Sequence, residues 1–215
     1  MHRIVCPLAA AACAATVCLP AQAGEVFAGV GTTGFELGFA AKLGESTGIH
    51  VDGEFLNYKR TWDNDGVTYD AKVKFSSLGL YGNYFLTERF RLTAGVLMGS
   101  RKVTGTGVSS GGQITVNGTT YALQAGDSLG LDVKFPAASP YLGLGFGHAD
   151  NGPGLGLYFD VGAVFGKPKV KLTPNGNLAN TVNQSDVDAE QAKLQDKMNK
   201  LRAYPAIKLG LSIGF

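Results

Sequence analysis

The chain has 215 residues, of which 31 are glycine and 17% are charged, and its formal net charge is +2. Glycine is therefore about twice as frequent as in ordinary proteins, and charged residues are scarcer than usual. This composition excludes a disordered chain and a basic nucleic-acid-binding protein, and the length suits one domain.

The first 23 residues have the features of a secretory signal peptide. Arg3 supplies the positive charge, residues 4–19 form an apolar run rich in alanine, and Ala21-Gln22-Ala23 matches the small-x-small cleavage pattern. An anchoring helix is the alternative, but the apolar run is short for one. We predict cleavage after Ala23, which leaves residues 24–215 as the mature domain. All three cysteines precede that point, so the exported domain is expected to contain no disulfide.

Large apolar residues alternate with glycine, serine or charged residues along most of the mature chain. The alternation is clear in seven segments, at residues 35–41, 49–55, 78–86, 90–98, 141–147, 155–165 and 207–215. A period of two is typical of β-strands whose two faces meet different surroundings. Glycine weakens a strand interior, so its concentration on one face indicates crowding there. A narrow barrel in lipid needs such strands, because its inside must be small or polar and its outside apolar.

We therefore predict an all-β fold, an antiparallel transmembrane up-and-down β-barrel with eight strands. Bacterial single-chain barrels have an even number of strands. Residues 25–41 supply the eighth strand if a turn or bulge at residues 31–34 divides them, because Val26 and Val30 are out of phase with Phe35. The alternation also changes phase at Ser76-Ser77, because the apolar residues before it, such as Val73, have the other parity from those after it, such as Leu78.

The connections between the segments alternate in length. Three are short, at residues 44–47, 87–89 and 148–154, and three are long, at residues 60–69, 102–134 and 167–203. Such alternation is typical of periplasmic turns and extracellular loops.

The long connections contain local structure of their own. Asn117-Gly118 predicts a tight hairpin, and Asp65-Gly66 predicts a second hairpin tip. In the last connection, Ser185 is a good N-cap for a short extracellular helix over residues 186–202, and Pro205 stops that helix.

Polar residues at the inward-facing positions of the strands form the candidate site. A charge inside a narrow barrel must be paired or hydrated, so we expect a lumen-lining charge network made of Glu36, His50, Asp52, Glu54, Arg91, Asp160 and Lys208. Lys72 and Lys74 extend this network in the same interpretation, and His148 is expected to be solvated in a turn.

Catalysis is the alternative interpretation of part of this set. His50, Asp52 and Glu54 share one strand face and are residue types suited to acid–base or metal chemistry. They are expected near the short-turn end, away from the outer leaflet, and no serine partner is evident. Residues 29–34 match the spacing of a dinucleotide fingerprint and residues 107–111 that of a nucleophile elbow, but neither has the helix that those motifs require. We expect no enzyme, no metal and no cofactor.

The last strand carries a specific signal. Residues 204–215 alternate strictly and end in Phe215. This segment resembles the terminal strand of Gram-negative outer-membrane proteins, which the barrel-assembly machinery reads, and the mature chain resembles a small protein of that class. Residues 140–145 and 209–212 also resemble segments of ornithine-uptake (CarO-type) porins. That resemblance implies uptake of small basic amino acids and assigns no substrate-binding residue.

These features predict a protein of the cell outer membrane that forms a narrow channel for passive uptake of small solutes. One alternative is a non-conducting barrel that presents its long extracellular loops, because eight strands leave an interior that side chains can fill. A lipid- or lipopolysaccharide-modifying enzyme is a weaker alternative. The expected partners are outer-membrane lipid and lipopolysaccharide, the barrel-assembly machinery and small solutes, and no nucleic acid.

Overall fold

A computed structural model describes residues 24–64, 67–109, 111–148 and 153–215. The predicted signal peptide, residues 1–23, and the predicted hairpin tip at Asp65-Gly66 lie outside the described residues.

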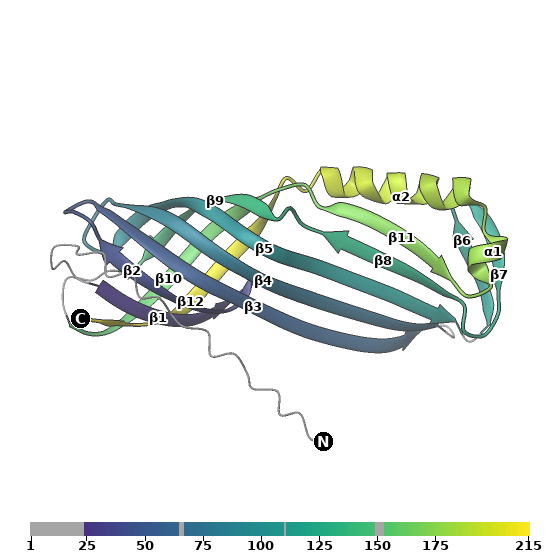
Figure 1. Ribbon diagram of the computed structural model, residues 1–215, viewed down its shortest axis with the longest axis horizontal. Coiled ribbons are helices and arrows are strands. Elements are labelled where there is room, and N and C mark those ends of the chain that lie inside the picture. The colour runs from purple at the N-terminus through teal and green to yellow at the C-terminus, as the bar shows by residue number, and fades with distance from the viewer. Residues whose placement is uncertain (1–23, 65–66, 110, 149–152) are drawn as a thin grey trace, which may run out of the picture.

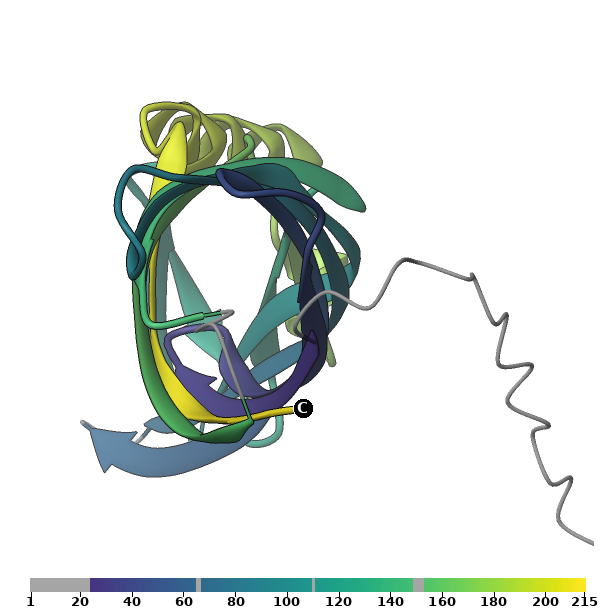
Figure 2. The same ribbon diagram turned by 90° about the vertical axis from the view of Figure 1, so that its left-hand side faces the viewer.

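Eight antiparallel strands close into a ring, which confirms the expected barrel. Each strand pairs with its neighbour, and the first pairs with the last through a register that joins Val26 to Ile213. Figure 2 shows this closed ring end-on. Its members, in order around the ring, are β1 (Gly24–Gly31), β2 (Gly34–Lys42), β3 (Thr47–Asn64), β4 (Val67–Phe85), β5 (Phe90–Ser109), β9 (Ala138–Phe146), β10 (Gly154–Phe165) and β12 (Ala203–Gly214).

The eighth strand arises at the N-terminal end, where the sequence changes phase. A two-residue turn at Thr32-Thr33 separates β1 from β2, with Gly31 paired to Gly34. The turn reverses the chain, so the apolar residues on both sides of it point outward despite their different parity.

Alternate side chains face opposite environments in the barrel. The outward set is large and apolar, and it stays exposed in the isolated chain, as Leu37, Leu157 and Leu211 do at 59%, 58% and 52%. The inward set combines glycine, tyrosine and charged residues. An apolar belt around a polar interior is the arrangement that lipid requires of a spanning barrel.

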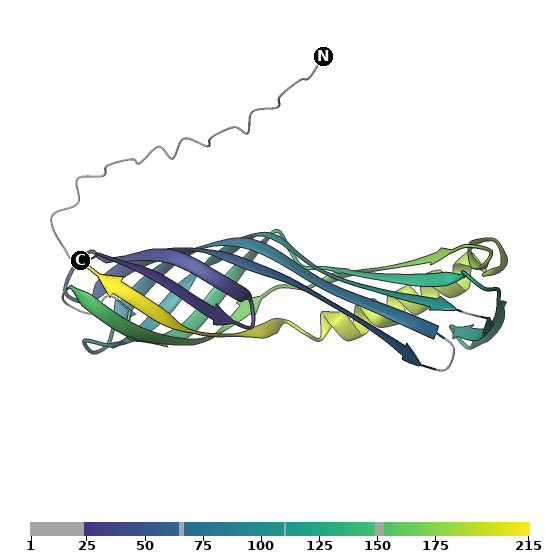
Figure 3. The ribbon, with the colours of Figure 1, turned by 90° about the horizontal axis from the view of Figure 1, so that it is seen from below.

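At one end, the barrel continues into an open five-stranded sheet. The long strands β3, β4 and β5 run past the ring, and β8 (Ser128–Lys134) and β11 (Lys169–Asn175) join them there (Figures 1 and 3). β6 (Gly112–Val116) and β7 (Thr119–Leu123) form a separate hairpin at the tip. Its turn is the predicted one, with positive φ at Asn117 and Gly118.

Two of the expected long loops are therefore mostly strand. Residues 60–64 and 67–69 continue β3 and β4, and residues 102–109 continue β5. β8 and β9 share one register against β5, with Lys134 opposite Lys102 and Ala138 opposite Met98, so they act as one interrupted strand. The expectation of loops was wrong here because the outward face stops being apolar beyond the membrane while the backbone pairing persists.

The phase change at Ser76-Ser77 marks that boundary. The β3–β4 register runs through both serines without a bulge. On the barrel side of Ser76 the outward residues are apolar, such as Leu78, whereas beyond it they are polar. Lys72 and Lys74 consequently lie on the outer face, so their expected place in the interior network was wrong.

Two helices complete the fold of the described residues. α1 (Leu178–Thr181) is a single turn at the tip, and α2 (Gln184–Asn199) lies along β11, where the Gln191 and Gln195 side-chain oxygens accept hydrogen bonds from two amides of that edge strand. α2 is the expected helix, but its N-cap is Asn183 and not Ser185, because the helix starts two residues earlier than predicted. Neither described helix has the length and apolarity to cross a membrane.

Candidate functional site: a charged barrel interior

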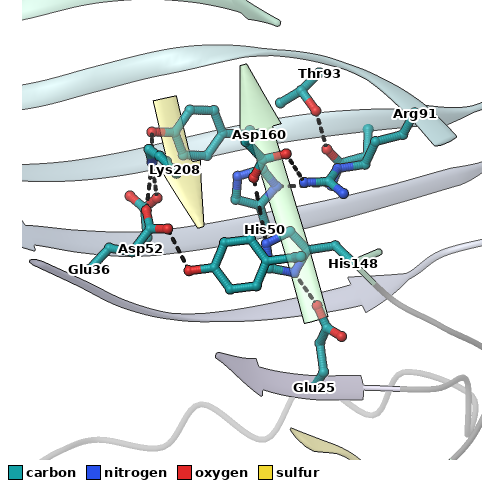
Figure 4. A network of polar contacts seen from close by, with 12 residues as sticks. Glu25, Glu36, His50, Asp52, Arg91, Thr93, His148, Asp160 and Lys208 are labelled. Carbon is teal, nitrogen blue, oxygen red and sulfur yellow. Dashed lines mark hydrogen bonds and ion pairs between the residues drawn. The ribbon is translucent and has the colours of Figure 1, made fainter. Parts of the chain in front are cut away.

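One lysine gathers three carboxylates in the barrel interior, and Figure 4 shows two of them, Glu36 and Asp52, beside it. Lys208 Nζ on β12 lies 2.8 Å from Glu36 Oε2 on β2 and 2.8 Å from Asp52 Oδ2. It also lies 2.6 Å from Glu54 Oε1, and both acids come from β3. Side chains at positions 52 and 54 share a strand face, and the register sets Glu36 beside Glu54. The cluster therefore holds a local excess of two negative charges when every group is ionised.

A second cluster surrounds Arg91 on β5. Its Nη2 donates to Asp160 Oδ1 on β10 at 2.5 Å. His148 Nε2 lies 3.7 Å from the other oxygen of Asp160, and His148 Nδ1 contacts Glu25 Oε1. Arg91 is 0% exposed, and the two carboxylates and the imidazole are almost completely buried. Buried charges are tolerated only when they are paired in this way.

His50 lies between aromatic rings rather than beside a nucleophile. Its Nδ1 is 3.0 Å from Asn83 Nδ2, and its ring stacks on Tyr81 with centroids 4.2 Å apart. Asn83 Oδ1 in turn accepts a hydrogen bond from Thr93 at 2.9 Å. His50 is thus part of the polar packing of the interior.

Three tyrosines fill the interior against glycine. Tyr158 Cε1 would lie 2.5 Å from a Cβ at Gly210, and Tyr141 Cζ would lie 2.5 Å from a Cβ at Gly162. Tyr81 occupies the same kind of position over Gly79. Real Cβ atoms do not approach other heavy atoms so closely, so the glycines make room for the rings. This is the crowding that the excess of glycine on one face predicted.

Arg101 forms a further layer toward the extended sheet. Its Nη2 donates to Pro136 O at 2.8 Å and to Ser139 Oγ at 2.7 Å, and its Nη1 donates to the Tyr204 hydroxyl. The side chain is 2% exposed. Together with Arg91 and Lys208, it provides a third buried basic group along the barrel axis.

The three carboxylates around Lys208 are also the group of described residues with the geometry of a cation site. One oxygen each from Glu36, Asp52 and Glu54 lies within 4.8 Å of the others. The lysine ammonium already fills the space between them. This arrangement therefore suits a cation that competes with Lys208.

The structure places all seven sequence-predicted residues in the interior. Lys208 joins Glu36, Asp52 and Glu54, whereas Arg91 joins Asp160, and His50 lies between the two clusters without an ion pair to either among the described contacts. Phe215 follows β12, its ring lies 6.4 Å from that of Phe39, and its backbone pairs with Gly24. Its role as an assembly signal stays a prediction.

Two members of the Arg91 cluster were missed from the sequence. Glu25 has the same parity as the interior residue Phe27, so the pattern in β1 contained a signal for it. His148 was expected to be solvated, and that expectation was wrong, because the residue is 1% exposed. Gly147 has φ +91°, which turns the chain and sends His148 back into the barrel, so strand parity could not place it.

Three side chains of α2 hold the turn of the tip hairpin. Asp186 accepts hydrogen bonds from the Tyr121 hydroxyl and from Asn117 Nδ2, the latter at 3.1 Å. Glu190 Oε2 accepts from the Asn117 backbone N–H at 3.3 Å, and Lys193 Nζ donates to the Asn117 side-chain oxygen at 2.7 Å. The bonds from Tyr121 and Asn117 lower the pKa of Asp186 below its ordinary value.

The fold is similar to that of two solved proteins. CarO from Acinetobacter baumannii matches with a TM-score of 0.62 at 22% identity, covering 89% of this chain and 97% of CarO. CarO2 from the same organism matches with a TM-score of 0.64 at 19% identity, covering 90% of this chain and 99% of CarO2. No protein-family model and no curated protein sequence matches the chain. The likeness confirms the CarO-type barrel fold that the strand segments indicated.

Proposed function

We propose that this protein is an outer-membrane channel for small cationic solutes, among them basic amino acids. The barrel fold and its apolar belt support a place in the membrane. The charge of the interior supports the class of solute, because among the described residues the barrel buries five carboxylates against three basic side chains. The carboxylates are Glu25, Glu36, Asp52, Glu54 and Asp160, and the basic residues are Arg91, Arg101 and Lys208.

The grouping of three carboxylates around Lys208 is the observation that carries the proposal. A merely structural interior is better filled by apolar packing, because buried ion pairs recover little more than their desolvation cost. Ionisable groups at membrane depth are instead typical of solute and ion pathways. Asp52 Oδ1 and Glu54 Oε2 are buried and have no hydrogen-bond partner among the described residues, so they are acceptors available to a passing ammonium or guanidinium group.

Passage requires the interior side chains to move. Arg91 and Glu54 are both fully buried, so the interior is closed around these two side chains in this conformation. A solute with an ammonium group can take the place of the Lys208 ammonium among the same carboxylates. Exchange of one cation for another keeps the acids paired during the movement, and it disfavours anions.

Reconstitution of the purified barrel tests this function. We expect openings in planar bilayers and faster swelling of proteoliposomes in ornithine or arginine than in glutamate. The Asp52→Asn/Glu54→Gln variant should lower the ratio of basic to acidic solute uptake. The matched control is Asp188→Asn/Asp196→Asn, since both acids lie exposed on α2, outside the barrel. Absence of openings and of swelling would refute the channel.

A non-conducting barrel is the second candidate, and the closed interior favours it. In that case the clusters around Lys208 and Arg91 brace the ring, and the five-stranded extension with α2 is the functional surface. The same reconstitution separates the two candidates, because only the channel predicts solute flux that responds to Asp52 and Glu54.

A further inference from the structure

Lysines gather on the outer face of the five-stranded extension, one step beyond the apolar belt. On β4 and β5, Leu78 and Met98 are followed outward by Ser76 and Ser100. The next pair on this face is Lys74 and Lys102, directly opposite each other. The register continues this row across the sheet, since Lys102 pairs with Lys134 on β8, and Lys134 pairs with Lys169 on β11.

A second row lies one pleat farther out. It contains Lys59 opposite Lys72, then Thr104, then Asp132 opposite Lys171. We call the two rows together the lysine surface, which comprises Lys59, Lys72, Lys74, Lys102, Lys134, Lys169 and Lys171. Figure 1 shows the strands that carry it, side by side beyond the ring.

This arrangement of charge is unfavourable without a counter-ion. Residues directly opposite on neighbouring strands have Cβ atoms about 5 Å apart, and like charges in such pairs destabilise a sheet. Two carboxylates offset part of the charge, with Lys102 2.8 Å from Asp132 and Lys59 3.8 Å from Asp70. The first row still contains four adjacent lysines and no acid.

An open hollow of about 510 Å³ lies between β4 and β5 on this surface. Its lining consists of three lysines and three hydroxyl residues, all of them hydrogen-bond donors: Lys72, Lys74, Ser76, Ser100, Lys102 and Thr104. Ammonium and hydroxyl groups without an acid among them form a donor set that suits a phosphate.

The position of the hollow relative to the belt indicates the source of that phosphate. The outer face loses its apolar character at Ser76 and Ser100. Beyond them the apolar residues lie on the opposite face, where Val73, Val103, Val133 and Val170 stand in one row. Lys74 follows Ser76 by about 7 Å along the strand. The headgroup layer beside the hydrocarbon core is about 5–7 Å thick on each side, so the lysines lie at headgroup depth.

We propose that the lysine surface binds the phosphate groups of anionic lipids in the leaflet next to the extension. The acyl chains of such a lipid pack on Leu78 and Met98, and its phosphate occupies the hollow between Lys74 and Lys102. The inference rests on the barrel lying in lipid, and it does not depend on solute flux.

Native mass spectrometry of the detergent-purified full protein tests the surface. The probe is lipid A, whose sugar headgroup carries two phosphates, and zwitterionic phosphatidylcholine is the reference lipid. A lysine near an anionic lipid surface contributes roughly fivefold in affinity. We therefore expect Lys74→Gln/Lys102→Gln to lower lipid A affinity by about 25-fold and to leave phosphatidylcholine binding unchanged.

Two further variants control for charge and for folding. Lys193→Gln removes a lysine charge from an exposed position on α2, beside the tip hairpin and far from the belt, and should bind lipid A like the unchanged protein. Lys74→Arg/Lys102→Arg keeps the charge and should retain most of the affinity. If the double glutamine variant does not fold, each single Lys→Gln variant should show about one fivefold step.

Three results would overturn the proposal. One is undiminished lipid A binding by folded Lys74→Gln/Lys102→Gln. Another is an equal loss in the α2 control. The third is complete displacement of lipid A by inorganic phosphate at a concentration 10-fold lower than that of lipid A. That result would make the surface a site for free anions. Bilayer conductance of the same samples is measured separately, so a failure here is distinct from a failure of the proposed channel.

Discussion

Lys208 Nζ on β12 lies 2.8 Å from Asp52 Oδ2 on β3, although β1 and β2 separate the two strands in the ring. The contact therefore crosses the interior and does not follow the sheet. Such links join strands that backbone hydrogen bonds do not connect, so the same side chains that polarise the interior also brace it.

Replacing the lysine should reveal this bracing. Lys208→Met leaves three buried carboxylates without their cation, and breaking a buried ion pair from one side costs about 3–5 kcal/mol. We expect a loss of that size in the free energy of unfolding, measured by urea titration of the barrel in vesicles. Lys197→Met on the exposed face of α2 should change it by less than about 0.5 kcal/mol. Similar values for both variants would contradict the bracing role.

The packing of tyrosine on glycine leads to a second stability prediction. In Gly162→Ala, the new methyl group would lie 2.5 Å from Tyr141 Cζ. Overpacking of this kind costs about 1–3 kcal/mol, measurable in the same urea titrations. Gly82→Ala on the outer face is the control, because its nearest heavy atom lies 3.9 Å away. If Tyr141→Leu does not reduce the cost of Gly162→Ala, the clash does not involve the ring.

The strand pattern was enough to predict the ring, because every spanning strand must turn an apolar face to lipid. The same alternation also predicted that the residues around Lys208 point into the barrel. It could not reveal that β3, β4 and β5 continue beyond the ring, since the apolar face switches sides at Ser76 and the backbone pairing does not. Alternation could not place His148, because the positive φ of Gly147 interrupts it directly before this residue.

Ion selectivity offers a third prediction, which rests on the proposed channel. Lys208→Gln raises the local excess of negative charge around Glu36, Asp52 and Glu54 from two to three when all are ionised. We expect the reversal potential in a KCl gradient to shift toward stronger cation preference, and Asp52→Asn to shift it the opposite way. Shifts of the same sign in both variants would exclude an electrostatic origin at this cluster.

The edge strand β11 provides a fourth prediction. Val170 N donates to Gln195 Oε1 at 2.8 Å, and Leu172 N donates to Gln191 Oε1 at 2.9 Å. Side chains of α2 thus satisfy edge amides that would otherwise be free to pair with another chain. In Gln191→Ala/Gln195→Ala, both amides should exchange hydrogen roughly two- to tenfold faster, because each bond contributes about 0.5–1.5 kcal/mol. The Val103 amide, inside the sheet, serves as the reference and should not change.

The contact between the tip hairpin and α2 should weaken in acid. The hydrogen bond from Tyr121, followed by that from Asn117, lowers the pKa of Asp186. A carboxylate with a lowered pKa stabilises the folded state at every pH above its ordinary value, about 3.9, and loses this effect as the pH falls through the folded value. We therefore expect the amides of β6 and β7, corrected for intrinsic exchange, to be better protected at pH 6 than near pH 3.

Asp127 contributes to this pH dependence with the same sign, because backbone bonds from Gln124 and Leu178 lower its pKa. Asp186→Asn should accordingly reduce the pH dependence of this protection without abolishing it. Asp196→Asn, on the same helix, is the control and should leave the pH dependence intact. An unchanged pH dependence in Asp186→Asn would show that this carboxylate does not hold the tip hairpin.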